Sequence, residues 1–78
     1  MITYLDVEMS PSEPGDLDMY LLKISNSGLV TVRTRYGLAT ARAGEYFKTS
    51  SGVELGKLKS VDIKTGKVIY EVAIIACN

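Results

Sequence analysis

Short segments in which apolar and polar residues alternate, separated by turn-forming residues, are the feature that most limits the folds open to this chain. Residues 2–9, 19–25 and 29–36 alternate in this way, and a period of two is typical of half-buried strands. The Asn-Ser-Gly sequence at residues 26–28 predicts a hairpin turn, because Asn and Gly tolerate the positive φ angles of tight turns. A second hairpin is predicted over residues 61–72, around a Thr-Gly pair.

The segment 38–46 fits either a helix or a strand. Its Leu, Ala and Arg residues favour a helix, but Gly37 and Gly44 limit that helix to about two turns, which is marginal without tertiary support. A strand fits the same residues equally well. We therefore expect one small all-β domain over residues 1–78, a roll, sandwich or barrel of about five or six short antiparallel strands. A β-grasp-like α+β fold is the alternative if 38–46 is helical.

The composition is that of one small globular domain and removes several classes of enzyme. The chain has 78 residues, 46% of them hydrophobic and 23% charged, with nine bases balanced by nine acids. It contains no His and one Cys. Ser-His-Asp and Cys-His catalysis, the standard zinc sites and an internal disulfide are therefore excluded. We expect a protein that is not an enzyme.

The sequence motifs for ligand binding are all incomplete. Residues 52–58 approach the pattern of a phosphate-binding loop, but three residues rather than four separate the glycines and Leu follows the Lys. Glu13, Asp16 and Asp18 are clustered, but their spacing does not match a calcium-binding EF-hand loop and predicts a solvated acidic loop. We therefore expect no catalytic residue, no cofactor and no metal.

Charge is distributed unevenly along a chain that is neutral as a whole. Residues 1–18 hold five acids and no base, whereas residues 19–67 hold all nine bases and three acids. Within the basic stretch, cations alternate with aromatic rings, a combination that single-strand nucleic-acid binders use for backbone contact and base stacking. A solvated strand face explains the same residues without a ligand. The residues of this candidate binding face are Arg33, Arg35, Tyr36, Arg42, Tyr46 and Lys48.

The last predicted strand, which ends near residue 77, is apolar on both faces apart from Glu71. Something must therefore cover both faces. One interpretation is a central strand in a two-layer core. The other is contact of one face, or of the strand edge, with a second chain, as in a homodimer. The candidate self-association residues are Ile69, Val72, Ile74 and Ile75.

No segment predicts export or insertion into a membrane. The longest apolar run, residues 72–77, is far shorter than the ~20 residues of a membrane-spanning helix. Acids interrupt the apolar residues of the segment 1–8, which does not fit a signal peptide. A single unpaired thiol suits a reducing compartment, so we expect a cytoplasmic protein.

These observations favour a non-catalytic protein-interaction or assembly module, an accessory or inhibitor-like protein that binds a larger protein. The alternative is a small nucleic-acid-binding β-barrel that uses the basic and aromatic face. Chains this short that begin with Met are typical of accessory proteins encoded by phages and mobile elements, so such an origin is part of the expectation.

Overall fold

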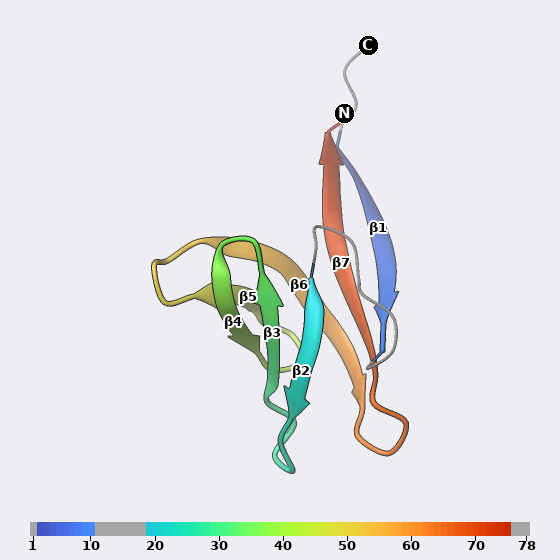
Figure 1. Cartoon of the computed structure of the whole chain (residues 1–78). Helices are drawn as coiled ribbons and strands as arrows, with labels where there is room; N and C mark the ends of the chain where they lie inside the picture. The colour runs from blue at the N-terminus through green and yellow to red at the C-terminus, as the bar shows by residue number, and fades with distance from the viewer. Residues whose placement is uncertain (1, 11–18, 76–78) are drawn as a thin grey trace.

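The structure, a computed structural model, describes residues 2–10 and 19–75, and the regular elements formed by these residues are all strands. The seven strands are β1 (Ile2–Met9), β2 (Tyr20–Ile24), β3 (Val30–Thr34), β4 (Gly37–Ala41), β5 (Tyr46–Thr49), β6 (Glu54–Asp62) and β7 (Lys67–Ile75). They form one antiparallel sheet that curls almost into a closed barrel (Figure 1). The predicted all-β fold of short antiparallel strands is confirmed.

Of the two alternatives left open for residues 38–46, the structure has the strand. Residues 37–41 form β4, so the sheet has seven strands rather than five or six, and the β-grasp-like alternative fails with the helix. The cause is tertiary. All five residues of β4 pair with β3, and the side chains of Ala39 and Ala41 are buried in the core. Pairing and burial outweigh the helix propensity of alanine.

The strand order is simple except at β1. From β2 to β7, strands that are consecutive in the sequence are neighbours in the sheet, whose order is β1-β7-β6-β5-β4-β3-β2. β1 pairs with β7 instead, over eight consecutive pairs from Ile2↔Ile75 to Met9↔Val68. β1 and β2 are consequently the two edge strands of the sheet.

Both hairpins predicted from the sequence are present, and side-chain hydrogen bonds fix their turns. Between β2 and β3, Gly28 has a φ angle of 88°, and the Ser25 Oγ accepts the Leu29 N–H at 3.0 Å. Between β6 and β7, the Asp62 Oδ1 accepts backbone N–H groups of the turn, that of Thr65 at 3.2 Å among them. These hydrogen bonds lower the pKa of Asp62, because they stabilise its charged form.

The core lies inside the curl of the sheet and joins its two sides. Phe47 of β5 and Tyr70 of β7 are the largest fully buried side chains. Their rings meet edge to face with centroids 6.2 Å apart, a favourable aromatic geometry. The buried hydrophobic residues of the core are Met9, Met19, Val30, Val32, Ala39, Ala41, Phe47, Leu58, Val68, Tyr70 and Val72.

β6 is the strand shared by the two sides of the sheet, and a glycine permits its path. Its first half pairs with β5 as far as Lys57, and its second half pairs with β7 from Lys57↔Glu71 onward. Gly56 lies where the pairing changes. A Cβ at this position would be 2.6 Å from the Glu71 carbonyl oxygen and 3.0 Å from a ring carbon of Tyr70. The close approach of β6 to β7 therefore requires glycine.

Beyond this junction, β1 and β7 continue as a two-stranded projection. The pairing of β6 with β7 ends at Glu71, whereas the pairing of β1 with β7 extends to Ile75. In Figure 1 the ends of these two strands reach past the rest of the sheet, in a molecule that measures 43 × 26 × 22 Å. We call residues 2–5 and 72–75 the arm.

Candidate functional site

The six residues of the predicted binding face are all exposed, but the structure separates them into two groups. Arg33 lies in β3, Arg35 and Tyr36 in the β3–β4 turn, Arg42 in the β4–β5 connection, and Tyr46 and Lys48 in β5. The turn and the connection lie at opposite ends of β4. The four residue steps along that strand, about 13 Å, separate the turn from the connection, whereas Arg33 and Lys48 pair with Leu38 and Thr40 nearer its middle.

Arg33 lies between two exposed side chains that the sequence prediction missed. In the antiparallel register, Tyr20 of β2 is its partner on one side and Leu38 of β4 on the other. The guanidinium carbon of Arg33 is 5.2 Å from the centroid of the Tyr20 ring, which is a cation–π contact. Tyr20 is 40% exposed and Leu38 57%. We call these three residues the Arg33 row.

A buried threonine holds the turn that carries Arg35 and Tyr36. The Thr34 hydroxyl donates to the Gly37 carbonyl at 2.8 Å and accepts the Tyr36 N–H at 3.0 Å. Gly37 has a φ angle of 106°, which favours glycine at this position. The Tyr36 side chain therefore lies on a fixed turn, and it is exposed.

The second group of the predicted face surrounds the β4–β5 connection, which is also held by specific hydrogen bonds. The Glu45 carboxylate accepts the backbone N–H of Arg42 at 2.8 Å. The Gly44 N–H and the Glu45 carbonyl bond to the two backbone groups of Leu58 in β6, each at 2.8 Å. Arg42 consequently projects from a connection that is anchored to the sheet, and Tyr46 follows it as the first residue of β5.

On the other side of the sheet, charges are paired. The Lys59 Nζ lies 3.2 Å from the Asp6 Oδ1 and 3.7 Å from the Glu71 Oε2. Lys67 and Glu8 form a third pair at 3.4 Å. Asp6, through its hydrogen bond and its charge, raises the pKa of Lys59, and Glu71 adds to this effect. Each acid of β1 and β7 thus has a lysine partner.

The basic residues of strands β2–β5 have no such carboxylate partners on their own strands. These strands contain no acidic residue. Within residues 2–10 and 19–75, no acid forms an ion pair with Arg33, Arg42 or Lys48. We call β2–β5 with their connections the basic half, and β1, β6 and β7 the ion-paired half. Among the residues that the structure describes, the uneven charge of the sequence therefore becomes an uneven charge of the surface.

The predicted self-association residues of β7 fall into different environments. Val72 is buried in the core and Ile69 is half-buried. Ile74 and Ile75 belong to the arm, where their backbones pair with β1. Their side chains lie outside the described part of the structure, so the surroundings of these side chains remain a prediction.

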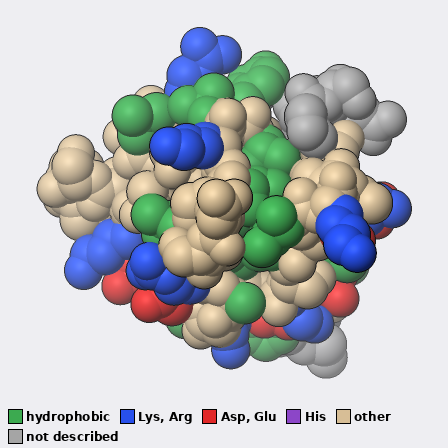
Figure 2. Space-filling model, turned by 90° about the horizontal axis from the view of Figure 1, so that it is seen from below, with side chains coloured by type: hydrophobic (Ala, Val, Ile, Leu, Met, Phe, Trp, Pro, Cys, Tyr) green, Lys and Arg blue, Asp and Glu red, His purple; other side chains and the backbone are tan. Residues whose placement is uncertain are grey.

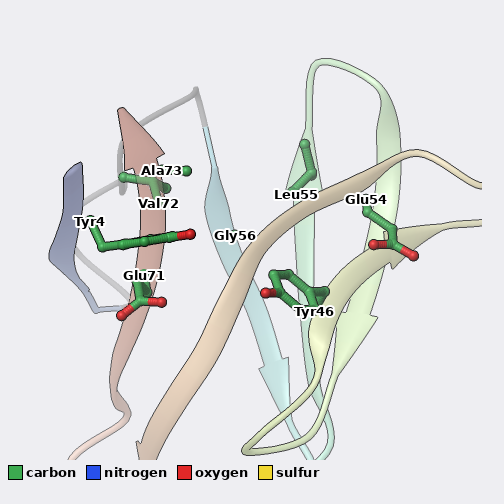
Figure 3. Close-up of a pocket in the computed structure, with 8 residues that line it drawn as sticks. All are labelled: Tyr4, Tyr46, Glu54, Leu55, Gly56, Glu71, Val72 and Ala73. Atoms are coloured by element: carbon green, nitrogen blue, oxygen red, sulfur yellow. The ribbon is translucent and has the colours of Figure 1, made fainter. Parts of the chain in front are cut away.

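A hollow of about 340 Å³ opens where β6 turns away from β7. Tyr4 of β1 and Tyr46 of β5 line it, and their hydroxyls are turned toward each other (Figure 3). Glu54 and Glu71 contribute carboxylates to the same hollow, and Gly56 forms part of its wall. The exposed rings of Tyr4 and Tyr46 thus belong to a concave surface at the base of the arm.

A second hollow, of about 280 Å³, lies between β2 and the β6–β7 turn. Leu22 and Ile63 line it and are both exposed, and Lys23 and Lys64 flank them. Figure 2 shows the molecule from the end that carries this turn, with hydrophobic side chains near the middle and charged side chains around them. This end of the barrel therefore combines apolar and basic surface.

Several sequence features yield no further site among the described residues. No group of three Cys, Asp or Glu side chains within residues 2–10 and 19–75 is placed to hold a metal ion, and no helix there is long and apolar enough to cross a membrane. The clustered Glu13, Asp16 and Asp18, and Cys77, lie outside these residues. Comparison with protein-family models, with curated proteins and with solved structures finds no match for this chain.

Proposed function

We propose that this chain is a non-catalytic protein-interaction module that docks onto an acidic, partly apolar surface of a larger protein through the Arg33 row. The observation that carries this proposal is the Arg33 row itself: an arginine stacked on Tyr20 and flanked by Leu38, all three exposed, on a half of the sheet whose strands have no acid. Arginine and tyrosine are enriched among the residues that contribute most to protein–protein binding.

The stacking of Arg33 on Tyr20 supports a role in recognition rather than in folding. Each lysine paired with β1 or β7 contacts a carboxylate, whereas Arg33 contacts only the face of an exposed ring among the described residues. Arg33 is exposed, and its planar guanidinium carries five N–H donors, two of which a carboxylate of a partner can accept together. The leucine and the tyrosine on either side supply the apolar area that such an ion pair needs around it.

The proposal is tested by capture of the partner from a lysate of the source organism, with and without nuclease. The wild-type chain is compared with Arg33→Glu and with the matched charge reversal Lys64→Glu, which changes an exposed lysine on the β6–β7 turn. We expect a protein that is captured in the presence of nuclease by the wild type and by Lys64→Glu, but not by Arg33→Glu.

Two outcomes contradict this proposal. One is capture that Arg33→Glu and Lys64→Glu retain equally, which would place the partner away from the Arg33 row. The other is capture that nuclease abolishes, which would make nucleic acid the ligand. Circular dichroism of both variants shows whether they keep the strand content of the wild type, as expected for exposed positions.

A small nucleic-acid-binding barrel is the second candidate function, and one observation favours it. Arg42 and Lys48 are exposed, have no acidic partner among the described residues, and lie in the same half as the exposed rings of Tyr36 and Tyr46. In gel shifts with single-stranded DNA and RNA, this function predicts binding that weakens steeply as salt rises, because counterions are released. No retardation at low salt would exclude it.

We further propose that this protein acts in the cytoplasm and that a phage or a mobile element encodes it as an accessory protein. The single cysteine supports a reducing compartment. Fractionation of cells that express the tagged chain tests the location, and recovery in the cytoplasmic fraction is expected.

A further inference from the structure

The arm combines two properties that bear on a second binding surface. Its β1 strand is exposed on both faces, because the adjacent residues Tyr4 and Leu5, whose side chains point in opposite directions, are 59% and 48% exposed, whereas Val72 of β7 is buried. It also carries no charge, since residues 2–5 and 72–75 include no Asp, Glu, Lys or Arg. A two-stranded ribbon by itself is only marginally stable in water. The arm would therefore gain from a further strand.

The two edge strands of the sheet differ in how they are protected against pairing with another chain. β2 carries Lys23, and a bulge between Leu21 and Lys23 interrupts its pairing with β3. Lysines and bulges are two devices that keep sheet edges from joining. β1 is paired with β7 over eight residues with no bulge, and its first four residues are uncharged. Its outer edge is the unprotected one among the described strands.

We propose that two copies of this chain associate by antiparallel pairing of residues 2–4 in β1 with the same residues of the second copy. A two-fold axis normal to the sheet sets Thr3 opposite Thr3 of the other copy and Ile2 opposite Tyr4. Asp6 of each copy falls outside the paired segment, so that no like charges face each other directly. The two arms then form one four-stranded sheet around a two-fold axis.

The absence of charge in the arm argues for a second copy as the occupant. A second copy presents the same uncharged strand, so no charge is buried when the two edges join. A charged strand of another protein would place unpaired charges against Tyr4 and Leu5, which is unfavourable. The association is independent of docking at the Arg33 row, because that row lies on β2–β4 and the arm on β1 and β7.

Sedimentation equilibrium of the full chain over a wide concentration range tests the proposal. We expect the wild type to approach twice its 8.5 kDa chain mass. Thr3→Lys and Tyr4→Lys should each weaken the dimer by about tenfold or more, because each substitution brings two like charges close together across the axis. Thr40→Lys is the matched control: this exposed threonine lies in β4, and its substitution should leave the dimer unchanged.

Hydrogen exchange locates the interface independently of the variants. The amides of residues 2–4 should exchange more slowly as the concentration of the wild type rises, whereas those of residues 20–24 should not change. A wild type that stays monomeric at every concentration would overturn the proposal. A dimer that is unaffected by Thr3→Lys and Tyr4→Lys, or that protects β2 rather than β1, would also overturn it. Circular dichroism shows which variants fold, and either lysine variant alone is sufficient for the comparison.

Discussion

The two halves of the sheet use their charges differently. In the ion-paired half, Asp6, Glu8 and Glu71 each contact a lysine of another strand. In the basic half, Arg33 and Lys48 project from strands without a single acid. Exposed ion pairs contribute little stability each, but they fix which residues lie opposite one another. Arg33 and Lys48 have no acidic partner among the described residues, so ion pairs do not fix their positions.

The largest loss of stability is expected from a substitution in the core, where side chains of the two halves meet. Phe47 of the basic half contacts Tyr70 of the ion-paired half, and both are fully buried. Phe47→Ala should lower the free energy of unfolding by about 3–5 kcal/mol, the usual cost of removing a buried ring. For a domain of this size, that loss leaves little or no folded protein. Urea denaturation followed by circular dichroism measures it, and a loss below about 1 kcal/mol would show that the halves are held together elsewhere.

A smaller effect is expected where β6 passes from one half to the other. Gly56→Ala places a methyl group 2.6 Å from the Glu71 carbonyl oxygen, so the backbone must shift. We expect a loss of about 1–3 kcal/mol in the free energy of unfolding, the range typical of overpacked sites. Ser60→Ala, at an exposed position of the same strand, should change it by less than about 0.5 kcal/mol. Equal urea midpoints for the two variants would contradict the role given to Gly56.

The smallest effect concerns the charges themselves. Lys59→Met should lower the urea midpoint slightly at low salt, because Asp6 and Glu71 lose their partner, and added salt should reduce the difference. Arg33→Met should leave the midpoint nearly unchanged. The contrast fails if Arg33→Met is the more destabilising of the two.

The contribution of Lys59 to stability should depend on pH, because its pKa is raised in the folded state. Because Asp6 raises this pKa above its ordinary value of 10.5, the stabilisation by Lys59 is complete below pH 10.5 and is lost as pH rises through the higher value in the folded state. The difference in urea midpoint between the wild type and Lys59→Met should therefore shrink at strongly alkaline pH. A difference that grows with pH would contradict the assigned pair.

Local patterns in the sequence predict both hairpins, but they do not determine the features that depend on which strands pair. Gly28 and Gly66 occupy turns with positive φ angles, as residues of turn-forming pairs do. The segment 38–46 was ambiguous because its alanines fit a helix as well as a strand, and only the contact with β3 decides between them. Of the adjacent aromatic residues Tyr46 and Phe47, the alternation along β5 buries Phe47 and exposes Tyr46.

The candidate site was predicted only in part, for a related reason. The cations and rings were recognised as a group along the chain, yet β4 separates them into two groups in space. The partner of Arg33 is Tyr20, which the register of the first hairpin places opposite it. The bulge beside Leu21 and Lys23 changes which residues of β2 face outward, and nothing in the alternation of the sequence marks a bulge. The alternating segment 29–36 also extends past the observed strand, since β3 ends at Thr34 and Tyr36 lies exposed in the following turn.

We expect a partner protein to cover the Arg33 row and to leave the ion-paired half free. Hydroxyl-radical footprinting of the captured complex tests this expectation most directly, because the method reports the solvent access of individual side chains. Tyr20 and Leu38 are exposed in the free chain, and so is Ile63 on the β6–β7 turn. Partner binding should slow the oxidation of Tyr20 and Leu38 and leave that of Ile63 unchanged. Protection of Ile63 with unchanged oxidation of Tyr20 and Leu38 would contradict this expectation.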